Sequence, residues 1–217
     1  VYYKMFLSAV ARPRYVEATG KWWDGKLGTW PFVDSESVQA ERSSFNREAG
    51  TYETKSINVT KDVYRSFLVG KVLPAIVAKW PCDEKIVKLQ HDNACAHVTP
   101  SDIQLTAILA AYKDHGWSIS LELQPPNSPD TNILDLGYFA AIQSLQHQKS
   151  ARSIDELVAA VEVAYQEYPY VRLDRTFMTL PGGDHSFDGR QHLQGAPHVE
   201  REEGAKGSLT EERHVSS

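Results

Sequence analysis

The stretch from residue 86 to residue 135 constrains the fold most, because it alternates between strand-like and helix-like patterns. The apolar run at 86–91 has the length of a buried strand and ends at Asp92. A second run at 117–123 alternates apolar and polar residues, and Asp135 lies in the first turn of the helix that follows. Functional groups of α/β sheets gather at the carboxyl ends of strands. Two carboxylates delivered there by separate elements predict a divalent-metal site.

The first third of the chain fits the same class. Residues 5–11 form a near-continuous apolar run, and the turn signal Asp24-Gly25 precedes a second run at 27–33, so we expect an antiparallel pair of strands. The polar residues 34–59 indicate an exposed connection. A helix is expected over 60–79, with Thr60 as its N-cap and an interruption at Pro74. Its apolar stripe, at intervals of four residues, consists of Tyr64, Leu68, Val72 and Ile76.

Two further helices have recognisable starts. Thr99, Pro100 and an acid in the first turn are typical of a helix N-terminus, and Gly116 is typical of its end. The sequence from Ser153 to Glu156 is a capping box for a later helix. The resulting order β-β-α-β-α-β-α-α predicts an α/β domain over residues 1–180, with a mixed sheet and flanking helices.

The tail at 181–217 has a different composition. It is rich in Gly, His, Glu, Ser and Arg and poor in apolar residues. Such a segment cannot bury enough surface to offset the entropy of ordering, so we expect it to be disordered. Its histidines lack metal-ligand spacing, which favours solvated side chains.

Composition excludes some classes of protein and leaves others open. The net charge is -5 and the two cysteines, Cys82 and Cys95, form no CxxC pair, which favours a reduced intracellular chain. No apolar run is long enough for a membrane span, and no signal-peptide pattern precedes the first strand, so no membrane partner is expected. The acidity does not favour nucleic-acid binding, although an acidic catalytic protein can still carry a local basic groove.

The central motifs resemble those of a known family. QHDNACAH followed by QPPNSPDTNILDLGYFAAIQSLQ is similar to the catalytic core of Tc1/mariner-type transposases, especially the plant mariner-like branch. The fragments MFLSAVARPR, DGKLGTWPF, VTKDVYRSFLVGKVLPAI and SIDELVAAVEVAYQ stand in the order that this branch shows. The resemblance covers roughly residues 4–180, and its co-linearity makes it specific.

The resemblance implies an RNase H-like fold and a triad of acids that binds two Mg²⁺ or Mn²⁺ ions. Asp92 matches the second acid and Asp135 the third, ahead of its competitor Asp130, which lies five residues earlier. Asn93 and His97, together with Asn127 and Ser128, match the polar companions of the motif and would support the acids or contact DNA. The full-length form would cut and join transposon ends in the nucleus, with DNA and a second copy as partners.

The family's first acid belongs to an Asp-Glu-Lys-Trp-Phe strand upstream of the segment that 5–14 matches. The expectation is therefore an inactive fragment that lacks the first, central strand of the sheet. Either the strand at 86–91 pairs directly with the strand at 4–11, or the chain alone is poorly stable. The spacing from Asp92 to Asp135 also suggests a small insertion around 99–116.

Other interpretations remain open at this point. Asp92 can be a turn residue, Asp135 a helix-start charge and His97 a structural histidine. The chain can be a domesticated or degenerate remnant that binds DNA or protein without catalysis. It can also be another RNase H-like nuclease that recruits an acid from elsewhere.

Overall fold

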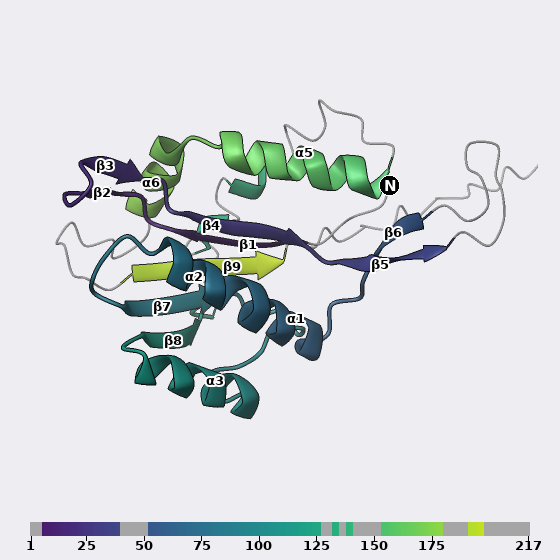
Figure 1. The fold of residues 1–217 in the computed structure, drawn as a ribbon, viewed down its shortest axis with the longest axis horizontal. Coiled ribbons are helices and arrows are strands. Elements are labelled where there is room, and N and C mark those ends of the chain that lie inside the picture. Colours follow the sequence, from purple (N-terminus) through teal and green to yellow (C-terminus); the bar gives the residue numbers. More distant parts are fainter. Residues whose placement is uncertain are drawn as a thin grey trace, which may run out of the picture.

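The structure is a computed structural model, and it describes residues 6–39, 52–126, 132–134, 138–140, 153–179 and 191–197. Its main sheet has five strands in the order β4-β1-β9-β7-β8 (Figure 1). Their bounds are β4 Lys26–Pro31, β1 Phe6–Ala11, β9 Gln191–Pro197, β7 Ile86–His91 and β8 Ser118–Leu123. β1 is antiparallel to β4 and β9, whereas β7 is parallel to β8 and β9. The predicted mixed α/β fold is confirmed.

The antiparallel pair of β1 and β4 is confirmed, with a short hairpin inserted between its strands. This hairpin consists of β2 (Arg14–Val16) and β3 (Lys21–Trp23). The chain returns to the sheet through Gly25, which has a φ of 76°. The backbone N–H of Ala11 donates to the Gly25 carbonyl at 2.8 Å. A Cβ at Gly25 would collide with the carbonyl of Ala11. Only glycine fits this close approach at a positive φ.

The connection at 34–59 differs from expectation. β5 (Val33–Gln39) and β6 (Tyr52–Ser56) pair as a separate antiparallel ribbon, while residues 40–51 lie outside the described part. Polar residues were expected to give an exposed loop. A two-stranded ribbon can instead satisfy its backbone through its own ladder, so its polar side chains do not prevent strand formation.

The predicted helix over 60–79 forms as three consecutive pieces. These are α1 (Lys61–Phe67), the π-helical turn η1 (Leu68–Val72) and α2 (Leu73–Lys79). The hydroxyl of Thr60 accepts from the amide of Val63 at 3.3 Å, as expected of an N-cap. Pro74 stands in the first turn of α2 and lacks the N–H that a continuous ladder needs, which accounts for the wider turn before it.

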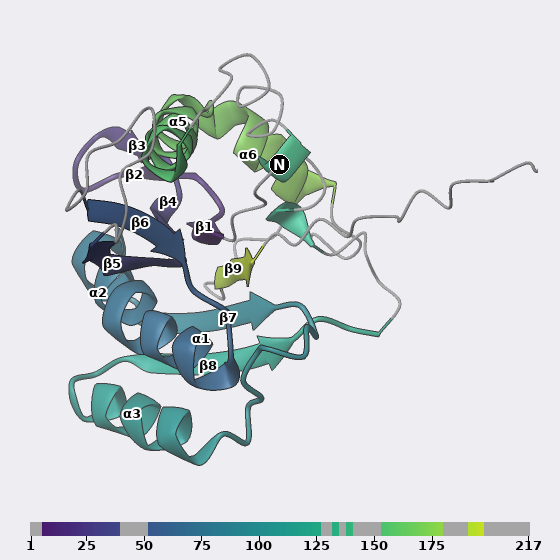
Figure 2. The same cartoon turned by 90° about the vertical axis from the view of Figure 1, so that its right-hand side faces the viewer.

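Helices cover both faces of the main sheet (Figure 2). On one face lie α1, η1, α2 and α3 (Ile103–Asp114), and on the other α5 (Ile154–Glu167) and α6 (Tyr170–Met178). Every residue of β1 is buried, because Leu7, Ala9 and Ala11 belong to the first core and Phe6 and Val10 to the second. The apolar stripe of the 61–79 segment fills the first core with Tyr64, Leu68, Val72 and Ile76.

The start of α3 corrects the sequence prediction. Its N-cap is Asp102 rather than Thr99, and the carboxylate accepts from the amide of Leu105 at 2.9 Å. Asp102 also binds the guanidinium of Arg65 through contacts of 2.6–3.1 Å. This tertiary partner lies on α1 and so is invisible to a local capping rule. The helix starts at Ile103, whose side chain is 85% exposed.

β9 bears on two predictions. The tail was expected to be disordered from residue 181, but residues 191–197 form a strand; the rest of the tail lies outside the described residues. Of the two alternatives for the strand at 86–91, direct pairing with the strand at 4–11 is excluded because β9 lies between β1 and β7. Poor stability of the chain alone stays a prediction. The backbone groups of those two strands need partners, and a segment of low apolar content can supply them through its own backbone.

Candidate functional site

Asp92 follows directly after β7, at the carboxyl end of the parallel part of the sheet. Its side chain is 27% exposed and its Oδ1 accepts from the amide of Ala94 at 3.0 Å. The amide of Gln124, which follows β8, donates to the carbonyl of His91 at 2.9 Å. The Asn93 side-chain amide donates to the Gln124 carbonyl, also at 2.9 Å. Asn93 therefore ties together the carboxyl ends of two neighbouring strands.

His97 fixes the orientation of Asp92. Its Nδ1 lies 2.7 Å from Oδ1 of Asp92 and 2.9 Å from the Asp92 backbone carbonyl. A carbonyl oxygen only accepts, so Nδ1 carries the proton and donates to both oxygens. The His97 side chain is 1% exposed, and its Nε2 is buried without a hydrogen-bond partner among the described residues. Because the imidazole cannot move freely, the carboxylate that it holds is also restrained.

The His97 ring is stacked between two other rings, those of Tyr64 and His91. The ring centroids of Tyr64 and His97 are 4.1 Å apart, and those of His97 and His91 are 4.9 Å apart. The hydroxyl of Tyr64 is 2.9 Å from Nδ1 of His91, and Tyr64 is fully buried. Helix α1, strand β7 and the loop after β7 each supply one ring, so the stack links three elements beneath Asp92.

Electrostatics favour an ionised Asp92. Burial alone would raise the pKa of Asp92, but the hydrogen bond and charge of His97 and the Ala94 amide outweigh it, so the pKa lies below its ordinary value. Burial and the neighbouring His97 lower the pKa of His91 to about 4. Burial, followed by the charge of Asp92, raises the pKa of Tyr64 well above 10. At neutral pH Asp92 is therefore ionised, whereas His91 and Tyr64 are neutral.

The carboxylate can accept a hard cation. The hydrogen bonds from His97 and Ala94 both use Oδ1, the side chain is 27% exposed, and a carboxylate oxygen is the ligand that Mg²⁺ and Mn²⁺ prefer. In the same residues no three His, Cys, Asp or Glu side chains gather closely enough to hold a metal ion. Asp135, Asn127 and Ser128 lie outside the described part of the chain. The structure therefore places Asp92, Asn93 and His97 together and leaves the other three candidates as predictions.

The neighbours of Asp135 are described and buried. Ile133 and Leu134 on one side and Tyr138 and Phe139 on the other belong to the second core, against α5 and α6. This burial agrees with the apolar pattern expected for a helix there.

Sequence reasoning missed Tyr64 and His91 as parts of the site. Tyr64 was interpreted only as a member of an apolar helical stripe, and His91 only as the end of a strand. A signal was present in retrospect: His91 and His97 flank the aspartate in a short segment that also carries the motif. What the sequence could not show is that Tyr64, 27 positions away from His91, completes the stack.

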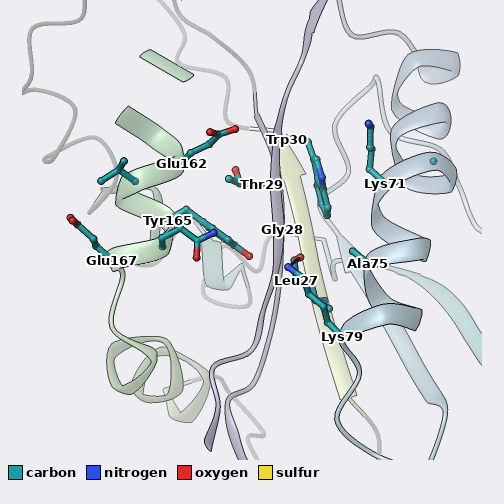
Figure 3. Close-up of a pocket in the computed structure, with 13 residues that line it drawn as sticks. Leu27, Gly28, Thr29, Trp30, Lys71, Ala75, Lys79, Glu162, Tyr165 and Glu167 are labelled. Atoms are coloured by element: carbon teal, nitrogen blue, oxygen red, sulfur yellow. Dashed lines mark hydrogen bonds between the residues drawn. The ribbon is translucent and has the colours of Figure 1, made fainter. Parts of the chain in front are cut away.

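A separate hollow of about 710 Å³ surrounds the outer edge of β4 (Figure 3). Lys71, Lys79 and Trp30 line one wall, while Glu162 and Glu167 of α5 line the other. β4 is three strands from β7 in the sheet order, or roughly 14 Å at the usual strand spacing. Lys79 already donates to the Leu27 carbonyl at 2.6 Å, so part of the strand edge is occupied. This hollow is distinct from the Asp92 cluster.

Comparisons with known proteins give no further constraint: no family model, curated protein or solved structure matches the chain. Within the described ranges, none of the helices is both long and apolar enough to span a membrane.

Proposed function

We propose that this chain derives from a mariner-like DDE/D transposase, with an RNase H-like fold in which Asp92 and Asp135 hold a divalent metal ion. The parent activity is cleavage and joining of DNA strands in the nucleus. The observation that carries the proposal is Asp92 itself. It stands at the carboxyl end of β7, ionised, restrained by the buried His97 and with a side chain that is 27% exposed.

The sheet order supports the fold part of the proposal. In an RNase H-like sheet the first strand lies between the second strand and the strand that bears the second acid. β9 stands at the corresponding place here, between β1 and β7, antiparallel to the former and parallel to the latter. The tail thus substitutes for the expected central strand in the backbone ladder.

The substitution does not extend to the chemistry. A bound pair of Mg²⁺ ions would activate the attacking oxygen and stabilise the leaving oxygen of a phosphodiester. The protein's part is to present ionised carboxylates rigidly, which Asp92 does through His97. The β9 sequence QHLQGAP contains no carboxylate. We therefore expect this chain to bind a divalent ion weakly and not to cut DNA.

A Mn²⁺ titration followed by electron paramagnetic resonance tests the metal assignment. Asp92→Asn and Asp135→Asn should each weaken Mn²⁺ binding by at least about tenfold, because each removes a charged oxygen ligand. Asp114→Asn, at the exposed end of α3, is the matched control and should leave binding unchanged. Equal binding by the wild type and both site variants would overturn the assignment.

Supercoiled plasmid with Mg²⁺ or Mn²⁺ tests the expected inactivity. Residues 1–217 should leave the plasmid intact. Robust nicking that disappears in Asp92→Asn would show that an acid from elsewhere completes the site. Nicking that persists in Asp92→Asn would remove Asp92 from the chemistry.

The absence of a carboxylate in β9 favours a second candidate, a non-catalytic remnant that binds DNA or protein through the retained fold. Its DNA part predicts a salt-sensitive shift of duplex DNA in a mobility-shift titration. No shift at low salt would eliminate that part.

A further inference from the structure

β9 is a weak strand in the most demanding position of the sheet. Its residues, QHLQGAP, include no β-branched or aromatic side chain, while Gly195 and Pro197 are two of the poorest strand formers. Its neighbours are different: β1 reads FLSAVA and β7 reads IVKLQH. β9 therefore has a lower strand propensity than β1 and β7, the two strands on either side of it, which we call the walls of the site.

The pairing of β9 is also incomplete. On the β1 side it runs from Leu193, opposite Ala11, to Pro197, opposite Leu7. On the β7 side it ends at Gln194, opposite Gln90. Pro197 has no N–H to donate and is the kind of residue normally confined to sheet edges. The carboxyl-terminal half of β9 is thus held from one side only.

The two walls, in contrast, are firmly built. Leu7, Ala9 and Val10 of β1 and Val87 of β7 are 0% exposed, and Leu89 of β7 is 3% exposed. Both walls have further strands on their outer sides, β4 and β8. A vacated place would leave two facing rows of backbone donors and acceptors within the core, so some strand must fill it.

From this contrast we propose that the space between β1 and β7 is a strand-accepting site, and that β9 is its exchangeable occupant. The partner is an extended peptide with β-branched residues and without proline, which adds parallel to β7 and antiparallel to β1. Strand addition derives its affinity from main-chain hydrogen bonds, so a better strand former can replace a poorer one at the same ladder. This inference is independent of the proposed metal chemistry.

β9 keeps its place because it is tethered to the same chain. A tethered segment acts at an effective concentration on the order of millimolar, so an external peptide must bind more strongly per ladder contact to displace it. A higher strand propensity supplies this extra binding free energy, since poor and good strand formers differ by up to about 1 kcal/mol per position.

Two fluorescent peptides of residues 189–199 test the site on the full chain by anisotropy. One has the native sequence, and the other carries Gly195→Val and Pro197→Val. We expect the substituted peptide to bind at least about tenfold more tightly than the native one. On binding, hydrogen exchange should accelerate at the chain's own residues 191–197 and stay slow in β1 and β7. A scrambled peptide of the substituted composition is the control for non-specific adhesion.

A disulfide lock makes the test specific for exchange. Ala9 and Gly195 are direct cross-strand partners, at a Cα separation that a disulfide spans. Ala9→Cys with Gly195→Cys, in a Cys82→Ser and Cys95→Ser background, should lose peptide binding when oxidised and regain it when reduced. Equal binding by the oxidised and reduced forms would overturn the proposal, as would failure of the substituted peptide to bind the reduced form.

Discussion

β7 and β9 lie side by side in one sheet and are built from opposite kinds of sequence. β7 has an apolar run, two residues of its own (Val87 and Leu89) in the first core, and Asp92 directly after its end. β9 has a polar, glycine- and proline-containing sequence from a tail of low apolar content. Both nevertheless pair on two sides. The difference shows that a segment of low strand propensity can occupy a central place in a sheet, because the backbone groups of the two neighbouring strands need hydrogen-bond partners.

The same contrast extends to the side-chain bonds around each strand. On the β7 side, Tyr64, His91 and His97 form a buried stack, and Arg65 binds Asp102 to join α1 to α3. These contacts hold β7 and Asp92 in one arrangement. For β9 the described interactions are its two backbone ladders. The fixed part of the site and its exchangeable neighbour are therefore adjacent.

Removing β9 should have the largest effect. Deletion of residues 181–217 leaves β1 and β7 with unpaired edges within the core; roughly eight lost backbone hydrogen bonds at about 0.5 kcal/mol each lower the free energy of unfolding by about 4 kcal/mol. Deletion of residues 198–217 alone is the matched control and should leave the urea midpoint unchanged. If both truncated chains have the urea midpoint of the full chain, β9 contributes nothing to the free energy of unfolding, and the contrast drawn between β7 and β9 is wrong.

The stack beneath Asp92 should give the next largest effect. Tyr64→Phe removes a buried hydroxyl and leaves Nδ1 of His91 without its 2.9 Å partner, which should cost about 2 kcal/mol of unfolding free energy. Tyr112→Phe, at a partly buried ring on α3 that packs against the first core, should cost less than about 0.5 kcal/mol. Urea denaturation of both variants checks this. Equal costs would mean that the stack stabilises the β7 side no more than ordinary packing does.

Local patterns predicted the β7 side well. The stripe of Tyr64, Leu68, Val72 and Ile76 was predicted from its spacing and is buried throughout. The strand before Asp92 was predicted from its apolar run and length. Both signals come from residues within a few positions of each other, so periodicity is sufficient to detect them.

Features that depend on distant partners could not be predicted in this way. Asp102 caps α3 in part because Arg65, 37 positions earlier, binds the same carboxylate. β9 forms because two edges from the first half of the chain need a partner, while its own composition favours disorder. Of the candidate site, the sequence predicted Asp92, Asn93 and His97 as neighbours, and the ring stack required the folded arrangement.

The Arg65–Asp102 contact makes the β7 side sensitive to acid. The hydrogen bond from Arg65 lowers the pKa of Asp102 below its ordinary value of 3.8, so the folded chain binds this proton less readily than the unfolded chain. The contribution to stability is therefore complete above about pH 4 and is lost as the pH falls through the lowered pKa. Asp102→Asn keeps a capping side chain but removes the charge, and should lower the Tm at pH 7 by about 3 °C.

Thermal melts at pH 7 and near pH 3 check this prediction. The difference in Tm between the wild type and Asp102→Asn should shrink at the lower pH, because the unfolded wild-type chain then binds the proton that the folded carboxyl resists. Asp114→Asn, on the same helix, should show no such convergence. A constant difference between the wild type and Asp102→Asn at both pH values would assign the effect to capping geometry instead of charge.

The smallest effect should come from giving β9 the acid that it lacks. The parallel register ends at Gln90 and Gln194; if it continued for two more residues, Ala196 would lie beside Asp92. Ala196→Asp should then strengthen Mn²⁺ binding by about threefold, because a second nearby carboxylate adds charge for the cation. The gain is small because the exchangeable β9 holds the new carboxylate less rigidly than His97 holds Asp92.

Ala159→Asp, the same substitution at an exposed position of α5, should leave Mn²⁺ binding at the wild-type level. Combining Ala196→Asp with Asp92→Asn should abolish the gain, since the added acid acts only together with Asp92. If Ala196→Asp and Ala159→Asp bind Mn²⁺ equally, β9 does not bring its end to the metal site. β7 and β9 would then be hydrogen-bonded to each other, but β9 would take no part in binding a metal ion at Asp92.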